Sequence, residues 1–124
     1  MSIPVAVTDL ADAMAQRPYA YLLTVSDDGR PHAVAVVPTL AAGELTMEVG
    51  RRTTGNAAAR PESVSLVWPP SVPGEYSLIA DGRARVENDR VVVTPTKAVL
   101  HRPAPSEAAS PDSCGSDCQP VKFA

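Results

Sequence analysis

The sequence has few aromatic residues, almost no lysine, two cysteines and no long apolar run, and each shortage excludes a class of protein. The formal net charge is −3 and the sequence pI is about 5.2, whereas proteins that bind nucleic acid usually carry a basic face. No apolar run approaches the roughly 20 residues of a membrane span. The N-terminus also lacks the basic and uninterrupted apolar regions of a signal peptide. We therefore expect a cytoplasmic protein that has neither nucleic acid nor a membrane as its partner.

The composition that remains favours a single β-rich domain. Phe, Trp and Tyr make up only 4% of the 124 residues, so a core must come from Val, Leu, Ile and Ala. Valine is prominent, and it favours half-buried pleated surfaces. Apolar alternation and turn signals predict about six strands, mostly joined by hairpin-length turns, and two short helices. The predicted strands are 19–26, 31–39, 44–50, 63–68, 76–87 and 91–100, and the predicted helices are 8–17 and 53–60.

Three local features indicate that this mainly β fold is a barrel or a sandwich. The strand 19–26 is apolar on both faces, which is typical of a strand inside a barrel, a sandwich or a dimer interface. Gly82, within the strand 76–87, indicates a bulge or a close approach of another backbone. Pro95 cannot donate a ladder hydrogen bond, so it predicts an edge position or a bulge. Thr8 or Asp9 is predicted to cap the first helix.

The C-terminal segment 103–124 differs in composition from residues 1–102 and is predicted to be a separate tail. It is rich in Pro, Ser, Ala and acidic residues, a composition that does not build a core. It holds both cysteines, Cys114 and Cys118, in the stretch "CGSDC". Three interpretations are open for this pair: a redox-active disulfide, half of a metal site shared with a second chain, or two exposed reduced thiols.

The densest cluster of positive charge and hydroxyl groups, "RRTTGNAAARP", lies directly before and within the predicted helix 53–60. Arginine forks match phosphate oxygens, and the N-terminus of a helix offers free N–H groups and the positive end of its dipole. Two interpretations are open. The cluster is a phosphate site, or Thr53 or Thr54 caps the helix beside solvated arginines.

The order of these elements resembles a known family. The stretches "YLLTVSDDGRPHAVAVVP", "GELTMEVGRRTTGNAAARPESVSLVWPP" and "GEYSLIADGRARV" cover most of residues 19–102 and resemble the flavin-binding split-barrel family, whose best-known members are pyridoxamine 5′-phosphate oxidases. The resemblance implies a homodimeric split antiparallel β-barrel. It also implies FMN or the deazaflavin F-420 as cofactor, with its phosphate held by Arg51, Arg52, Thr53, Thr54 and Asn56.

For the cofactor ring, the resemblance implies contacts along the second and third strands. The implied residues are Val36, Val37, Pro38, Thr39, Met47 and Glu48, although Glu48 also has an interpretation as a solvated carboxylate. Trp68, at the end of the fourth strand, has two interpretations of its own: stacking near the cofactor ring, or core or interface packing. The chain stops at 124 and lacks the longer C-terminal segment of the true oxidases, so oxidation of pyridoxamine phosphate itself is not expected.

The sequence shows no conventional catalytic constellation. His32 and His101 could each donate a proton or simply lie at the surface, and no metal-ligand spacing joins them. We therefore expect the cofactor to carry the chemistry, in an oxidoreductase that acts on a small organic substrate. Two alternatives remain: a protein that binds a flavin or another phosphate-bearing ligand without turnover, and a cofactor-free dimer whose tail cysteines sense metal or oxidants.

Overall fold

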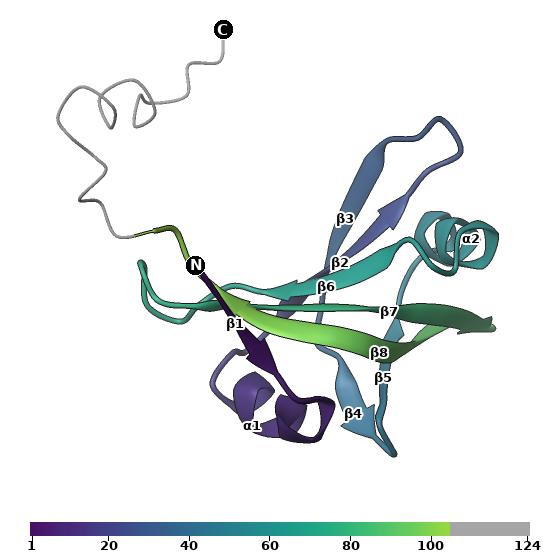
Figure 1. The fold of residues 1–124 in the computed structure, drawn as a ribbon. Helices are drawn as coiled ribbons and strands as arrows, with labels where there is room; N and C mark the ends of the chain where they lie inside the picture. The colour runs from purple at the N-terminus through teal and green to yellow at the C-terminus, as the bar shows by residue number, and fades with distance from the viewer. Residues whose placement is uncertain (105–124) are drawn as a thin grey trace, which may run out of the picture.

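The computed structural model describes residues 1–104, which form one antiparallel sheet that curls into a half-barrel (Figure 1). Along the sheet the strands follow the order β3-β2-β6-β7-β8-β5-β4, and β1 pairs with β8 outside this path. The strand bounds are β1 Ser2–Val5, β2 Ala20–Val25, β3 Pro31–Val36, β4 Thr39–Ala41, β5 Glu44–Glu48, β6 Val64–Trp68, β7 Ser77–Glu87 and β8 Arg90–His101. The mainly β fold agrees with the sequence, but the described part has eight strands where six were predicted.

The two additional strands are short and depend on distant partners. β1 has four residues and pairs with the end of β8, where Ser2 lies opposite His101. β4 has three residues and forms a hairpin with β5 through Ala42 and Gly43, which both adopt positive φ. The predicted strand 31–39 therefore ends at Val36, and the chain crosses from one end of the sheet to the other before β4 begins.

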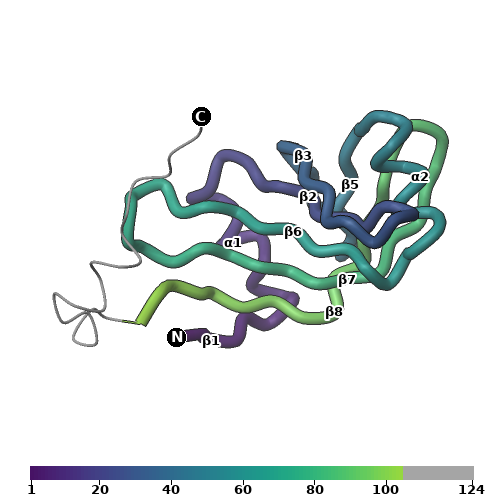
Figure 2. The backbone as a smooth tube through the Cα atoms, turned by 90° about the horizontal axis from the view of Figure 1, so that it is seen from above, coloured from purple at the N-terminus to yellow at the C-terminus, as the bar shows by residue number. Residues whose placement is uncertain are grey.

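The hydrophobic core lies on the inner side of the curled sheet. The strands supply it from alternate positions, as the burial of Leu45 and Met47 on β5 shows. Each helix adds one fully buried apolar side chain, Leu10 from α1 (Leu10–Ala15) and Ala57 from α2 (Arg51–Ala59). In Figure 2, α1 and α2 lie toward opposite ends of the sheet. α2 packs on β2, β7 and β8.

The bend in the β7–β8 pair confirms the predictions for Gly82 and Pro95. The register of the pair shifts between Asp81 and Gly82, and Pro95 lies opposite Gly82. β5 pairs with β8 over residues 90–93 and β1 pairs with it over 98–101. Pro95 thus stands in the gap between these two partners, where its missing N–H leaves no ladder bond unmade.

The helices occur where they were predicted, but the predicted caps were wrong. A 3-10 turn, Val7–Asp9, leads into α1, and neither Thr8 nor Asp9 caps a helix with its side chain. α2 begins at Arg51, two residues earlier than predicted, with an extended Gly50 as its N-cap residue. The Thr54 hydroxyl donates a 3.0 Å hydrogen bond back to the carbonyl of Arg51, as a hydroxyl inside a helix does. No helix within residues 1–104 is long and apolar enough to span a membrane.

Candidate functional site

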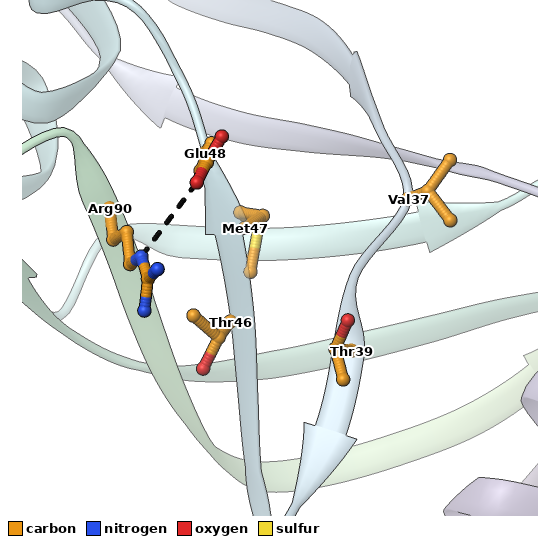
Figure 3. A pocket seen from close by; sticks show the side chains of 6 residues that line it. All are labelled: Val37, Thr39, Thr46, Met47, Glu48 and Arg90. Atoms are coloured by element: carbon orange, nitrogen blue, oxygen red, sulfur yellow. Dashed lines mark ion pairs between the residues drawn. The ribbon is translucent and has the colours of Figure 1, made fainter.

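A pocket of about 560 Å³ opens between the β3–β4 connection and β5. In Figure 3, Val37 and Thr39 stand on one side of it, and the side chains from β5 and β8 stand on the other. Its lining residues are Val37, Thr39, Thr46, Met47, Glu48 and Arg90. Four of these six, Val37, Thr39, Met47 and Glu48, belong to the set predicted from the sequence to contact a cofactor ring. We call this pocket the ring pocket, and its volume lies in the range of small-molecule sites.

The alternation of β5 gives the ring pocket an apolar floor and a polar rim. Met47 is only 4% exposed and points to the core, whereas Glu48 points outward. The Oε1 atom of Glu48 lies 3.9 Å from Nε of Arg90, and both side chains are more than half exposed. A pair this long and this exposed contributes little to stability. Its carboxylate and guanidinium are therefore both available to a ligand.

The sequence did not predict Thr46 and Arg90 as site residues. Arg90 reaches the pocket because β5 pairs antiparallel with β8 and places Glu48 opposite Arg90. These positions are 42 residues apart in the sequence. No local sequence pattern indicates how β5 and β8 are aligned. Only a prediction of the β5–β8 pairing could have identified Arg90.

The start of α2 lies directly after the ring pocket, because β5 ends at Glu48 and α2 begins at Arg51. Arg51 and Arg52 are exposed and form no ion pair with a carboxylate of residues 1–104. The first backbone hydrogen bond of the helix runs from the Thr54 N–H to the Gly50 carbonyl at 3.1 Å. The preceding N–H groups have no acceptor within the helix, as at any helix N-terminus. Within residues 1–104, the two arginines and the first N–H groups of α2 therefore have no protein partner that would compete with an anion.

Two other residues of the predicted phosphate site point into the fold. Thr53 is 2% exposed and Asn56 is 7% exposed. The side-chain amide of Asn56 donates a 3.1 Å hydrogen bond to the hydroxyl of Thr24 on β2. This bond joins α2 to the sheet, so Asn56 positions the helix, and its amide is not presented to a ligand.

Replacing Asn56 by alanine should lower the free energy of unfolding by about 1–3 kcal/mol, because it leaves the buried Thr24 hydroxyl without its partner. Urea unfolding followed by far-UV circular dichroism measures the loss. Replacing Thr24 by valine at the same time removes the unpaired hydroxyl, so the double variant should be more stable than Asn56→Ala. Equal stabilities of the single and double variants would contradict a buried structural bond.

The remaining predicted ring contacts lie in the interior. Trp68 is 1% exposed, Val36 is 7% exposed, and Pro38 is buried. Trp68 lies at the end of β6, opposite Leu78 of β7, inside the core cluster. None of these three side chains is among the described residues that line the ring pocket.

The histidines and cysteines occupy separate places. His101 is exposed at the end of β8, where its Nδ1 atom lies 3.0 Å from the Ser2 hydroxyl. His32 lies on β3, away from the ring pocket. Among residues 1–104, no three His, Cys, Asp or Glu side chains are grouped as a metal site would require. Cys114 and Cys118, like the rest of the predicted tail from 105 onward, lie outside the described residues.

Comparison with known proteins links the chain to two sequence relatives. No protein-family model matches it. The uncharacterized protein Mb0449c of Mycobacterium bovis and the uncharacterized protein MT0457 of Mycobacterium tuberculosis are each 41% identical to it over 128 aligned residues. The alignments cover 88% of this chain and 89% of each relative.

Solved structures share the fold at low sequence identity. A candidate pyridoxamine 5′-phosphate oxidase from Listeria innocua is 16% identical, with a TM-score of 0.62 over 76% of this chain and 96% of its own. The FAD-binding protein of Mycobacterium smegmatis is 17% identical, with a TM-score of 0.61 over 82% and 100%. An F420 reductase is 20% identical, with a TM-score of 0.52 over 75% and 93%. These likenesses show the fold of the pyridoxamine 5′-phosphate oxidase-like split barrels, which the sequence predicted.

Proposed function

The chain belongs to the protein family of the two mycobacterial relatives, and from this premise and its fold we propose that it binds a flavin-type cofactor. The cofactor is FMN or the deazaflavin F-420, held by a homodimer. We further propose that the protein is an oxidoreductase that acts on a small organic substrate. Solved neighbours with the same fold, described as an FAD-binding protein and an F420 reductase, support the cofactor class.

The observation that carries this proposal is the ring pocket and its place beside the start of α2. Val37 offers apolar surface for a flat ring above the floor that Met47 forms, and Thr39 and Thr46 add hydroxyl groups that can donate or accept hydrogen bonds. The exposed arginines and free N–H groups of α2 follow within a few residues. A pocket with apolar walls next to an anion-binding helix start fits a ligand that joins a ring to a phosphate.

When bound, the cofactor supplies the hydride chemistry, and the protein supplies binding, orientation and exclusion of water. The Glu48 carboxylate and the Arg90 guanidinium stand at the rim of the ring pocket, where they can orient a polar substrate. Met47 closes the floor against the core. This division of roles explains why the described residues contain no nucleophile–base pair in the pocket.

A second copy of the chain would cover the outer face of β2 and β3. The rings of Tyr19 and Tyr21 pack edge to face with centroids 5.5 Å apart, yet 38% and 39% of these residues are exposed. Val37 is 74% exposed at the mouth of the ring pocket. An exposed apolar patch of this kind marks an interaction surface. In the proposed homodimer, the partner buries it and closes the pocket.

The second candidate is a protein that binds the cofactor without turning over a substrate. It is favoured by the composition of the ring pocket, where Glu48 and Arg90 are the only ionisable side chains that residues 1–104 contribute. The two functions differ in one measurement. A bound cofactor that is reduced and then reoxidised by a small organic substrate indicates an enzyme, and a cofactor that exchanges no electrons indicates a binder.

The proposal is tested by titrating FMN and F-420 separately into the purified full chain while following cofactor fluorescence. We expect saturable binding of one cofactor. Arg52→Ala should weaken that binding by about 1.5–3 kcal/mol if the guanidinium forms a charged hydrogen bond. Lys97→Ala removes an exposed charge of β8 that does not line the ring pocket, and it should leave the affinity unchanged. If neither cofactor binds, the proposed function fails, and Cys114 and Cys118 become the next residues to replace.

A further inference from the structure

A second pocket, of about 580 Å³, lies between the end of α1 and the loop that joins β6 to β7. Among the residues that line it are Arg17 after α1, Pro70, Val72, Glu75 and Tyr76 of the loop, and Leu100 of β8. It shares no lining residue with the ring pocket. Because α1 and α2 lie toward opposite ends of the sheet (Figure 2), this pocket is remote from the arginines of α2. We call it the loop pocket.

The loop that forms one wall of the loop pocket is held in place. It contains three prolines within residues 69–73, and proline restricts the backbone. The Ser71 hydroxyl donates a 2.6 Å hydrogen bond to the carbonyl of Gln16, and Nη2 of Arg17 donates one of 2.9 Å to the carbonyl of Tyr76. These two bonds tie the loop to the end of α1. The loop pocket is therefore formed before a ligand arrives, as most small-molecule sites are.

Arg17 brings an uncompensated positive charge to the loop pocket. Its guanidinium donates to two backbone carbonyls, that of Ala13 at 2.6 Å and that of Tyr76 at 2.9 Å. It forms no ion pair with a carboxylate of residues 1–104, and its Nε atom has no hydrogen-bond partner among them. The side chain is half-buried, so its charge is screened less than that of an exposed arginine. The carbonyls orient the guanidinium, but only an anion neutralises it.

A second guanidinium adds to the positive charge beside the loop pocket. Cζ of Arg102 lies 4.5 Å from the centroid of the Tyr76 ring, which is the geometry of a cation–π contact. Arg102 likewise forms no ion pair with a carboxylate of the described residues. Glu75 is the only carboxylate that residues 1–104 contribute to the lining, and it is exposed. Two guanidinium groups and one carboxylate leave one positive charge in excess.

The remaining wall of the loop pocket is largely apolar. It is formed by Pro70, Val72 and Leu100 together with Tyr76. Val72 is 58% exposed, so its side chain is free to contact a ligand. One net positive charge beside an apolar wall matches a ligand that has one negative charge and an apolar body. A phosphate dianion would carry twice the charge that the loop pocket can balance.

We propose that the loop pocket binds a small organic acid, with its carboxylate on Arg17 and its apolar body against Val72 and Leu100. The planar N–H fork of arginine matches the two oxygens of a carboxylate. Such binding is reversible and forms no covalent bond. The inference does not rest on the proposed flavin cofactor, because the loop pocket and the ring pocket have separate linings.

The test uses octanoate and 4-phenylbutyrate as probes, and 1-octanol as the uncharged counterpart of octanoate. With the full chain, we expect titration calorimetry to show saturable binding of at least one carboxylate. Heteronuclear NMR should then show shifts of the amides of Arg17, Val72 and Tyr76, but not of Thr46 and Met47 in the ring pocket. Saturable binding of neither carboxylate, or shifts confined to the ring pocket, would overturn the proposal.

Two variants test the role of charge. Arg17→Gln removes the charge but keeps a side-chain N–H donor for the loop, and it should weaken carboxylate binding by about tenfold or more. Val72→Asp adds a negative charge at an exposed position, and it should weaken carboxylate binding in the same direction even if Arg17→Gln does not fold. Lys97→Ala is the charge control and should leave the affinity unchanged, and far-UV circular dichroism confirms that each variant is folded.

The neutral probe separates a charge effect from a loss of structure. Arg17→Gln should bind 1-octanol as the native chain does. An equal loss for octanoate and 1-octanol, or undiminished carboxylate binding in both variants, would overturn the proposal. Because no flavin is present in these titrations, the result stands whether or not the chain binds FMN or F-420.

Discussion

Replacing Trp68 by alanine should lower the free energy of unfolding by about 3–5 kcal/mol, the range observed when a large buried aromatic side chain is truncated. Trp68 is 1% exposed and has the largest of the fully buried side chains in the described part of the chain. Its neighbours Leu66 and Leu78 are held in paired strands, so they cannot move far enough to fill the cavity. Urea unfolding followed by far-UV circular dichroism measures the loss, since the variant has no tryptophan fluorescence.

Val72→Ala is the matched control for Trp68→Ala. Val72 is 58% exposed in the loop between β6 and β7, so its truncation should change stability by no more than about 0.5 kcal/mol. Trp68→Phe keeps most of the packing and tests the earlier prediction that the indole contacts a cofactor. We expect the phenylalanine variant to bind cofactor like the native chain. A selective loss of affinity in a stable Trp68→Phe variant would place the indole in the site.

The parts of the fold that the sequence predicted are those with a local cause. Alternating Leu45, Met47 and outward Glu48 specify a half-buried strand within five residues. The "DDGR" stretch specifies the turn before β3, where Gly29 has a φ of +81°. Such signals need no knowledge of the partner strand. They locate six of the described strands and both helices.

The parts that were missed depend on contacts between distant segments. β1 is a strand because the end of β8 offers it a partner, with Ser2 opposite His101. α2 starts early because Gly50 is extended and leaves Arg51 free to begin the helix. Neither cause can be seen in a short window of sequence.

The candidate site likewise contains residues that the sequence predicted and residues that it missed. Val37, Thr39, Met47 and Glu48 were predicted from the resemblance, and the structure brings them together in one pocket. That they bind a cofactor stays a prediction. Thr46 and Arg90 were missed, and Arg90 reaches the pocket only because β8 pairs with β5.

Replacing Gly82 by alanine should destabilise the protein by about 1–3 kcal/mol, the usual cost of forcing an extra group into a packed interior. A Cβ at this position would lie 2.5 Å from Cγ1 of Val93 and 2.6 Å from the carbonyl oxygen of Thr94. Rotating a side chain cannot relieve the second clash, because the oxygen belongs to the backbone of the paired strand. The bulge at Asp81 and Gly82 would have to open.

Gly55→Ala is the control, because the same chemical change should there have the opposite sign. Gly55 lies inside α2, and a Cβ built on it meets no atom within 4 Å. Alanine in a helix interior is favoured over glycine by about 0.5–1 kcal/mol, so this variant should be more stable than the native chain. Urea unfolding of the two variants side by side measures both effects. If Gly82→Ala loses no stability, the close approach of β8 to Gly82 is not a constraint on the fold. Opposite signs would show that glycine is required at the bend of the sheet and is merely tolerated in the helix that carries Arg51 and Arg52.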